Sequence, residues 1–399
     1  MKLIPVLSFD DVLIEKAHGS VLTDVNKKEY IDLNAGQFCA VLGHSNKEIN
    51  AELVKRITGI AHTSTSVISK EVVQVAEKIN RISGGMNAHS ILLSTGAEVI
   101  EFCLRYAKHI KKKTGVVVFD NGYHGLTLGA QSVTFSGRFA SPLVENIHPV
   151  DIPKTDKDID RVLVHIENIF SNNEIAACLF EPIVSVGGML FPDKSFFHKV
   201  RELCDKHDVF LIFDECQTGF GRTGDWFCYQ TYDVVPDMVA LAKGIGLGFP
   251  VAAALFKNTV VEQNDILITH YSSHQNDPFA AQVINIAIDY IEKNKVLDQV
   301  KETGSYFLEK LNNLNNPYIK NARATGLMLG ADLYKDGITD FRNIYKDLYK
   351  TCLNDGLIIQ GTSGGSIVRF LPDFLITKEN IDKAVAILDK NVTGVMQYV

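Results

Sequence analysis

Apolar residues follow two patterns from about residue 89 onward. Short runs rich in β-branched residues, bounded by polar loops, predict strands that are buried on both faces of a parallel sheet. Between these runs, apolar positions recur at helical spacing, as at Val99, Cys103, Tyr106 and Ile110. The predicted strands are 90–94, 115–119, 131–135, 176–181, 209–214, 238–242 and 251–256. Seven strands with interspersed helices predict an α/β fold with a doubly wound, mostly parallel sheet.

The flanking segments have other patterns. Near the start, alternation and turn residues between Gly19 and Leu33 predict a small hairpin, followed by a helix that begins near Asn46 and another over 67–82. After about residue 280, two helical stretches precede a strand, a helix over 340–355 and a strand pair. We therefore expect an N-terminal segment (1–50) that packs with a small domain, a large domain (51–285) and a small α+β C-terminal domain (286–399).

Composition narrows the class of protein. With 399 residues, 46% hydrophobic and 22% charged, the chain is of ordinary globular composition and long enough for two domains. A net charge of −7 argues against a nucleic-acid surface. Seven scattered cysteines without a CxxC pair indicate neither a disulfide framework nor a zinc site, and we expect no metal. The acidic start and the absence of a long apolar run predict a cytoplasmic protein without membrane contact.

Two residues with complementary chemistry end neighbouring apolar runs. Asp214 closes the run 209–214, and Lys243 follows the run 238–242 directly. Open α/β sheets bind ligands at the carboxyl ends of their strands, so both side chains could face one crevice. Pyridoxal phosphate requires an amine for its aldehyde and a carboxylate that keeps its ring nitrogen protonated. By themselves, the two residues would more often be an ordinary strand-end carboxylate and a solvated lysine.

The surrounding residues favour the cofactor. The stretch 214–224, DECQTGFGRTG, followed by LAKGIG at 241–246, resembles the signature of the class III aminotransferases, and the resemblance extends from about residue 15 to the C-terminus. It implies the pyridoxal-phosphate fold type I, in which Lys243 forms the Schiff base and later moves a proton between the substrate Cα and the cofactor. It also implies that Asp214 holds the ring nitrogen proton.

Two further motifs match the cofactor site of that family. Thr95-Gly96-Ala97 lies between a predicted strand and a helix, where backbone N–H groups can bind phosphate, although a plain capped turn has the same pattern. The family uses this loop for the cofactor phosphate. Tyr123-His124 follows the strand 115–119. The resemblance assigns Tyr123 to stacking on the pyridine ring and gives His124 a supporting role that is not defined.

Three more polar residues are assigned by the resemblance. Glu181 belongs to the hydrogen-bonding network near the cofactor, and Gln217 binds the phenolic oxygen of the ring. Their alternatives are a loop-positioning carboxylate and a helix cap. Ser273 lies where the family carries a hydroxyl that reaches the neighbouring subunit's phosphate, although threonine is more usual there. The match implies a homodimer, alone or paired into a tetramer, with active sites at the interface.

Substrate recognition is the last inference from the resemblance. Arg369, in an RFxP-like context, matches the arginine that binds the substrate carboxylate, whereas an isolated arginine there would usually be a surface charge. Many family members mask this arginine with a glutamate five residues after the one at Glu181, and that position is Val186 here. We expect an aminotransferase acting on a small amino acid and a 2-oxo acid. Gln37 and its surroundings resemble the 2,2-dialkylglycine decarboxylase branch, so decarboxylation-dependent transamination is an alternative, and amino-acid epimerisation is another.

Overall fold

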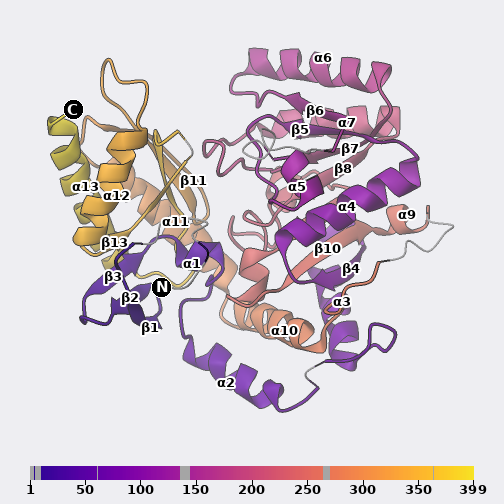
Figure 1. The fold of residues 1–399 in the computed structure, drawn as a ribbon, viewed down its shortest axis with the longest axis horizontal. Helices are drawn as coiled ribbons and strands as arrows, with labels where there is room; N and C mark the ends of the chain where they lie inside the picture. The colour runs from indigo at the N-terminus through magenta and orange to yellow at the C-terminus, as the bar shows by residue number, and fades with distance from the viewer. Residues whose placement is uncertain (1–3, 5–9, 61, 135–143, 264–269, 363) are drawn as a thin grey trace.

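The larger sheet contains the seven strands that the apolar runs suggest. A computed structural model describes residues 4, 10–60, 62–134, 144–263, 270–362 and 364–399 (Figure 1). The strands lie in the order β4–β10–β9–β8–β7–β5–β6. Their bounds are β4 Ala88–Leu93, β5 Gly115–Phe119, β6 Ile147–Val150, β7 Ile175–Phe180, β8 Phe210–Asp214, β9 Met238–Leu241 and β10 Ala252–Lys257. Only β10 runs antiparallel to its neighbours, so the prediction of a mostly parallel seven-stranded sheet is confirmed.

Both faces of the sheet are covered by helices, which explains why its strands are apolar throughout. Along β5, Val116 and Val118 pack on one face with α4 (Gly96–Lys111), whereas Val117 and Phe119 pack on the other with α7 (Lys194–His207). All five residues of β5 are buried. Successive side chains in a strand point to opposite faces, and two covered faces leave no position for a polar residue.

One predicted strand is wrong. Residues 128–132 form the short helix α5 (Leu128–Ser132), and the strand next to β5 is β6, Ile147–Val150. The hydroxyls of Ser132 and Thr134 donate to the carbonyls of Leu128 and Ala130, so local hydrogen bonds replace a strand ladder. β6 contains Pro149 and lies at the edge of the sheet, where a missing N–H is tolerated. Position 135 lies outside the described residues.

The C-terminal part of the chain builds a second sheet from four of its strands. Its order is β11–β12–β15–β14, with β11 Ile319–Thr325, β12 Met328–Leu333, β14 Gln360–Gly361 and β15 Ile367–Phe370. A separate sheet contains β1 (Ile14–His18), β2 (Val21–Asp24) and β3 (Glu29–Asp32), and β3 pairs in parallel with β13 (Leu357–Ile358). In Figure 1 these indigo N-terminal strands lie beside the orange and yellow C-terminal elements, apart from the larger sheet.

The remaining elements are helices and single turns. They are α1 Ala35–Phe38, α2 Lys47–Ile57, α3 Lys70–Ile82, η1 Gly84–Met86, α6 Asp156–Asn172, α8 Cys228–Tyr232, η2 Lys243–Gly246, α9 Asn258–Val261, α10 Pro278–Lys293, α11 Val296–Asn312, α12 Arg342–Asn354 and α13 Lys378–Gln397. Asn46 caps α2, as its position before the helix suggests, by accepting from the N–H groups of Glu48 and Ile49.

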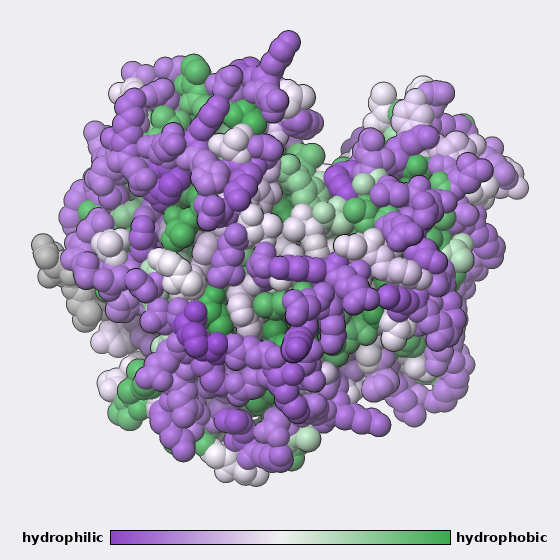
Figure 2. Space-filling view, turned by 180° about the vertical axis from the view of Figure 1, so that it is seen from behind, coloured by the Kyte–Doolittle hydropathy of each residue, from purple (hydrophilic) through white to green (hydrophobic). Residues whose placement is uncertain are grey.

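The molecular surface is mainly hydrophilic. Figure 2 shows this from behind, with apolar residues in small patches and in the notch between the two lobes. Within the part of the chain that the structure describes, no helix is both long and apolar enough to cross a bilayer.

Candidate active site

Four loops that follow strands of the larger sheet converge at one edge. A Cβ atom added at Gly96 would lie 3.1 Å from the Cys216 sulfur and 3.2 Å from Ala242 Cβ, so the start of α4 packs against the ends of β8 and β9. A Cβ atom added at Gly125 would lie 2.6 Å from Ala97 Cβ, which brings the loop after β5 against the same turn. A side chain at Gly125 would push these loops apart, whereas one at Gly96 would require its neighbours to shift by a few tenths of an ångström.

The turn between β4 and α4 offers backbone donors at a helix start. Thr95 is the N-cap of α4, and its hydroxyl accepts from the Glu98 N–H at 3.3 Å. The first N–H groups of a helix, here those of Gly96 and Ala97, have no acceptor within the helix. The exposed Thr95 hydroxyl and these donors together make a suitable anion site at the positive end of a 16-residue helix.

Asp214 is held as a buried carboxylate. Its Oδ2 lies 2.7 Å from Nδ1 of His124, and its Oδ1 accepts from the Cys216 N–H at 3.0 Å. The His124 side chain is fully buried, and its backbone N–H donates to Thr134 Oγ1 at 2.8 Å. Burial raises the pKa of Asp214, but the hydrogen bond and charge of His124, with the charge of Lys243, outweigh it, so the pKa lies below its ordinary value.

Lys243 starts η2 directly after β9, at the same edge of the sheet as Asp214. The two strands pair in parallel with Asp214 opposite Ala240, three residues before the lysine. Lys243 has a φ of 50°, a left-handed conformation that non-glycine residues adopt at a cost and that is frequent at functional sites. Its charge also acts on the thiol of Cys39, whose pKa burial raises. Lys243 therefore follows β9 at the edge of the sheet where Asp214 ends β8.

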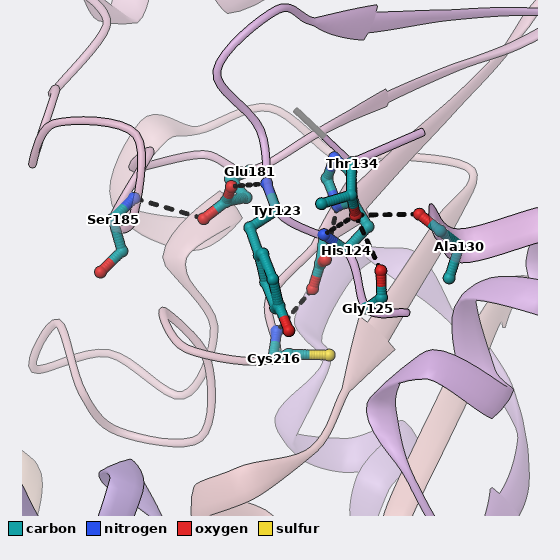
Figure 3. Close-up of polar contacts among 9 residues, drawn as sticks. Tyr123, His124, Gly125, Ala130, Thr134, Glu181, Ser185 and Cys216 are labelled. Carbon is teal, nitrogen blue, oxygen red and sulfur yellow. Dashed lines mark hydrogen bonds and ion pairs between the residues drawn. The ribbon is translucent and has the colours of Figure 1, made fainter. Parts of the chain in front are cut away.

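Glu181 connects the aromatic loop to the loop after β7 (Figure 3). Its two oxygens accept from the backbone N–H groups of Tyr123, at 2.9 Å, and Ser185, at 3.2 Å. Burial raises the pKa of Glu181 to about 7, and the charge of His124 opposes that rise. This carboxyl group therefore fixes the half-buried Tyr123 beside the ends of β7 and β8, and Figure 3 shows the ring extending past Cys216.

Arg369, on β15, is buried and makes few contacts with acidic groups. Its Nη1 donates to the Ser185 hydroxyl at 2.9 Å, and its Nε donates to the Gly361 carbonyl at 3.1 Å. Only 2% of the residue is exposed, and burial lowers its pKa to about 10, while nearby Tyr345 and Glu181 offset this. No carboxylate of the described residues forms a salt bridge with it. The guanidinium thus retains donor capacity for an anion.

Gln37 lies on a turn beside that arginine. All four residues of α1, Ala35 to Phe38, have positive φ, between 44° and 69°. Asp32 holds this left-handed turn by accepting from the N–H groups of Asn34 at 2.9 Å and Gly36 at 2.8 Å. The guanidinium of Arg369 lies 5.5 Å from the centre of the Phe38 ring. The exposed Gln37 accepts from Asn34 Nδ2 at 2.7 Å, which leaves its own amide N–H groups available.

Gln217 and Ser273, the last two predicted site residues, lie in different surroundings. Gln217 directly follows the buried Glu215-Cys216 pair, and its Oε1 is buried without a partner among the described residues. Ser273 is exposed on the loop before α10, where neighbouring Tyr271 is 82% exposed. The structure brings no described residue of the converging loops into hydrogen-bonding contact with Ser273.

Sequence reasoning missed Ser185, which contacts both Glu181 and Arg369. It drew attention to the adjacent position, Val186, because of the glutamate expected there. A serine beside the glycine pair at 187–188 marks a loop, but nothing in the local sequence indicates its partner 184 residues away. The contact depends on how the two sheets pack.

These residues fit pyridoxal phosphate. The helix start at Gly96 suits the phosphate, the ionised Asp214 suits a protonated ring nitrogen, and the partnerless Gln217 oxygen suits a polar substituent of the ring. Lys243 supplies the amine at the same edge. A flat ring would lie beside Tyr123, which Glu181 holds in place.

Comparison with known proteins gives a consistent result. The family model "Aminotransferase class-III" matches residues 7–392. An acetylornithine aminotransferase of Methanosarcina mazei is 31% identical over 383 residues, which cover 95% of this chain and 91% of that protein. A [LysW]-aminoadipate semialdehyde/glutamate semialdehyde transaminase of Sulfolobus acidocaldarius is 29% identical over 396 residues, covering 97% and 96%.

Solved structures share the fold. A transaminase from the marine bacterium Virgibacillus superposes with a TM-score of 0.93 at 23% identity, covering 100% of this chain and 97% of that one. An aminotransferase from Vibrio fluvialis in a PMP-bound form gives a TM-score of 0.92 at 22% identity, covering 99% and 97%.

Proposed function

This chain belongs to the class III aminotransferases, and we propose that its amino donor is a small α-amino acid whose carboxylate binds Arg369. As a member of that family it is a pyridoxal-phosphate-dependent enzyme of fold type I that moves an amino group between an amino acid and a 2-oxo acid. The observation that carries this proposal is the buried guanidinium, which among the described residues hydrogen-bonds only to a hydroxyl and a carbonyl. With Val186 in place of a masking acid, the arginine is free in every turnover.

The bound cofactor supplies an electron sink for the pair of electrons left at the substrate Cα. Asp214 maintains that sink by holding the proton on the ring nitrogen, and His124 keeps Asp214 ionised. The Lys243 amine carries the proton to and from Cα, because it comes from the strand next to Asp214 at the same edge. Tyr123 restricts the ring from the side, and the N–H groups of Gly96 and Ala97 bind the phosphate.

We propose a homodimer in which Ser273 completes the partner's phosphate site. Its support is the exposure of Ser273 on a loop next to a largely exposed tyrosine, together with exposed apolar residues at the end of α2 and in the segments before α3 and α10. These include Ile57, Val67, Ile68 and Tyr271. Seven thiols, all free, are consistent with a cytoplasmic location.

A second candidate is decarboxylation-dependent transamination. Gln37 favours it, because its amide lies on the turn that also carries Phe38 under Arg369. An amide there would bind the substrate carboxylate and so orient the bond to that group for cleavage, for which the cofactor would supply the electron sink. Carbon dioxide release in the same reactions decides between the two outcomes.

The test pairs an α-amino acid with the amine that its decarboxylation would give. We expect Arg369→Gln to lower kcat/KM for the amino acid about 100-fold, since charge-assisted hydrogen bonds are worth about 1.5–3 kcal/mol, while the amine is hardly affected. Arg342→Gln is the matched control, because Arg342 is exposed and forms its salt bridge among the described residues with Asp340. Equal losses for the two substrates would show that Arg369 does not bind the carboxylate.

A further inference from the structure

Two histidines converge on one carboxylate oxygen at the start of α10. His62 Nδ1 lies 2.8 Å from Asp277 Oδ2, and His274 Nδ1 lies 3.0 Å from the same atom. The other oxygen of Asp277 accepts from the N–H groups of Phe279, at 2.7 Å, and Ala280, at 3.4 Å. The helix therefore fixes the carboxylate so that Oδ2 points away from α10, toward both imidazoles.

Two of the three spacings among these atoms match the edges of a metal coordination shell. Metal–nitrogen and metal–oxygen bonds of about 2.0–2.2 Å place neighbouring ligand atoms about 2.9 Å apart at right angles and about 3.4 Å apart in a tetrahedron. The two distances to Oδ2 already have the first value. All three ligand atoms lie within 4.8 Å of one another, so the three side chains could converge on one ion.

The surroundings leave room for further ligands. A cavity of about 390 Å³ is lined by the three residues and by Ser94, Phe249 and other apolar side chains. His62 and His274 are exposed on one side, whereas Asp277 is 7% exposed. An ion bound here would have coordination positions left for water molecules.

From this geometry we propose that His62, His274 and Asp277 form a binding site for a divalent transition-metal ion. Two imidazole nitrogens and one carboxylate oxygen favour zinc, cobalt, nickel or copper over calcium or magnesium, which prefer all-oxygen sites. The ion would join the segment before α3 to the start of α10, next to the Ser273 loop. The proposal is independent of the substrate proposed above.

The experiment uses cofactor-loaded protein without an affinity tag, treated with a chelator and then titrated with Co²⁺ and with Zn²⁺. We expect one ion per chain by calorimetry and visible Co²⁺ absorption bands that zinc abolishes. His62→Ala and His274→Ala should weaken binding by more than about 100-fold, because even residues that only contact a metal ligand often contribute about 10–100-fold. Asp277→Asn should do the same while retaining the helix cap, since asparagine caps as well as aspartate.

His18→Ala is the matched control, because His18 is an exposed histidine on β1, outside this cluster, and this variant should bind like the wild type. Unchanged cofactor absorption and far-UV circular dichroism establish that each variant is folded. Absence of a saturable site in the wild-type protein overturns the proposal by itself. Binding that survives in folded His62→Ala and His274→Ala also overturns it and leaves the three residues as a hydrogen-bonded helix cap.

Discussion

Replacement of His124 by phenylalanine tests whether the buried ion pair controls the cofactor. The side chains of His124 and Asp214 are 0% and 5% exposed, and the atoms that pair are 2.7 Å apart. A hydrogen bond to a charged group contributes about 1.5–3 kcal/mol, and one pKa unit corresponds to about 1.4 kcal/mol. Phenylalanine fills similar volume without a donor, so the pKa of Asp214 should rise by about one to two units. The carboxylate would then hold the ring proton less well, and kcat should fall about 10–100-fold.

The assay is the pH dependence of kcat for amino transfer. A lowered pKa keeps Asp214 ionised down to acidic pH, and a raised pKa in His124→Phe moves the acidic limb of the profile upward by the same one to two units. His89→Phe is the control, because His89 is exposed on β4 and pairs with Asn258 at a distance from this loop. A variant that loses thermal stability but keeps kcat and the position of the acidic limb would refute the reasoning.

Three further substitutions have distinct expected outcomes. Lys243→Ala should abolish turnover and the absorption of the lysine-bound cofactor. A spectrophotometric titration should still show that the cofactor binds through its phosphate. Retained turnover would contradict the role of Lys243. Ser185→Ala removes the hydroxyl 2.9 Å from Arg369 and should raise KM for the amino acid up to about tenfold, with kcat little changed in steady-state assays. Burial raises the pKa of Glu181 from 4.5 to about 7, so its contribution to stability is present below pH 4.5 and lost as pH rises through 7. Glu181→Gln should remove about 3 kcal/mol of that pH dependence in urea unfolding of the cofactor-free protein, and an unchanged slope would contradict it.

The parts of the fold that sequence predicts well are those set by local pattern. Buried strands such as β5 and β8 are continuous apolar runs, and the polar residue that ends β8, Asp214, therefore marks the functional edge of the sheet. The error at 131–135 arose because Ser132 and Thr134 satisfy helix carbonyls locally, which alternation alone does not reveal. Where the same sequence pattern fits both a strand and a short helix, hydrogen bonds from side chains to the nearby backbone decide which of the two forms.

The local sequence pattern does not predict contacts between segments that are far apart in the chain, even where each segment carries a recognisable motif. The family resemblance predicts that Lys243 and Asp214 share a site, but no motif joins Ser185 to Arg369 or His62 to Asp277, which lie 184 and 215 residues apart. These pairs form only when the sheets and helices have packed. Their geometry is a property of tertiary structure, whereas the chemistry of each side chain is already present in the sequence.

The proposed substrate site lies where the chain's two ends pack together. Left-handed backbone costs roughly 1–2 kcal/mol for each non-glycine residue, yet three of the four residues in α1 are not glycine. Asp32 offsets that cost by accepting from Asn34 and Gly36 and by pairing with His44 at 2.9 Å. Because Asp32 ends β3, which pairs with β13, the turn that carries Phe38 under Arg369 is set by the same sheet that joins the N-terminal segment to the C-terminal elements. Any movement of those elements relative to the larger sheet would displace the arginine and the turn together, so the carboxylate site would move as a unit relative to Lys243.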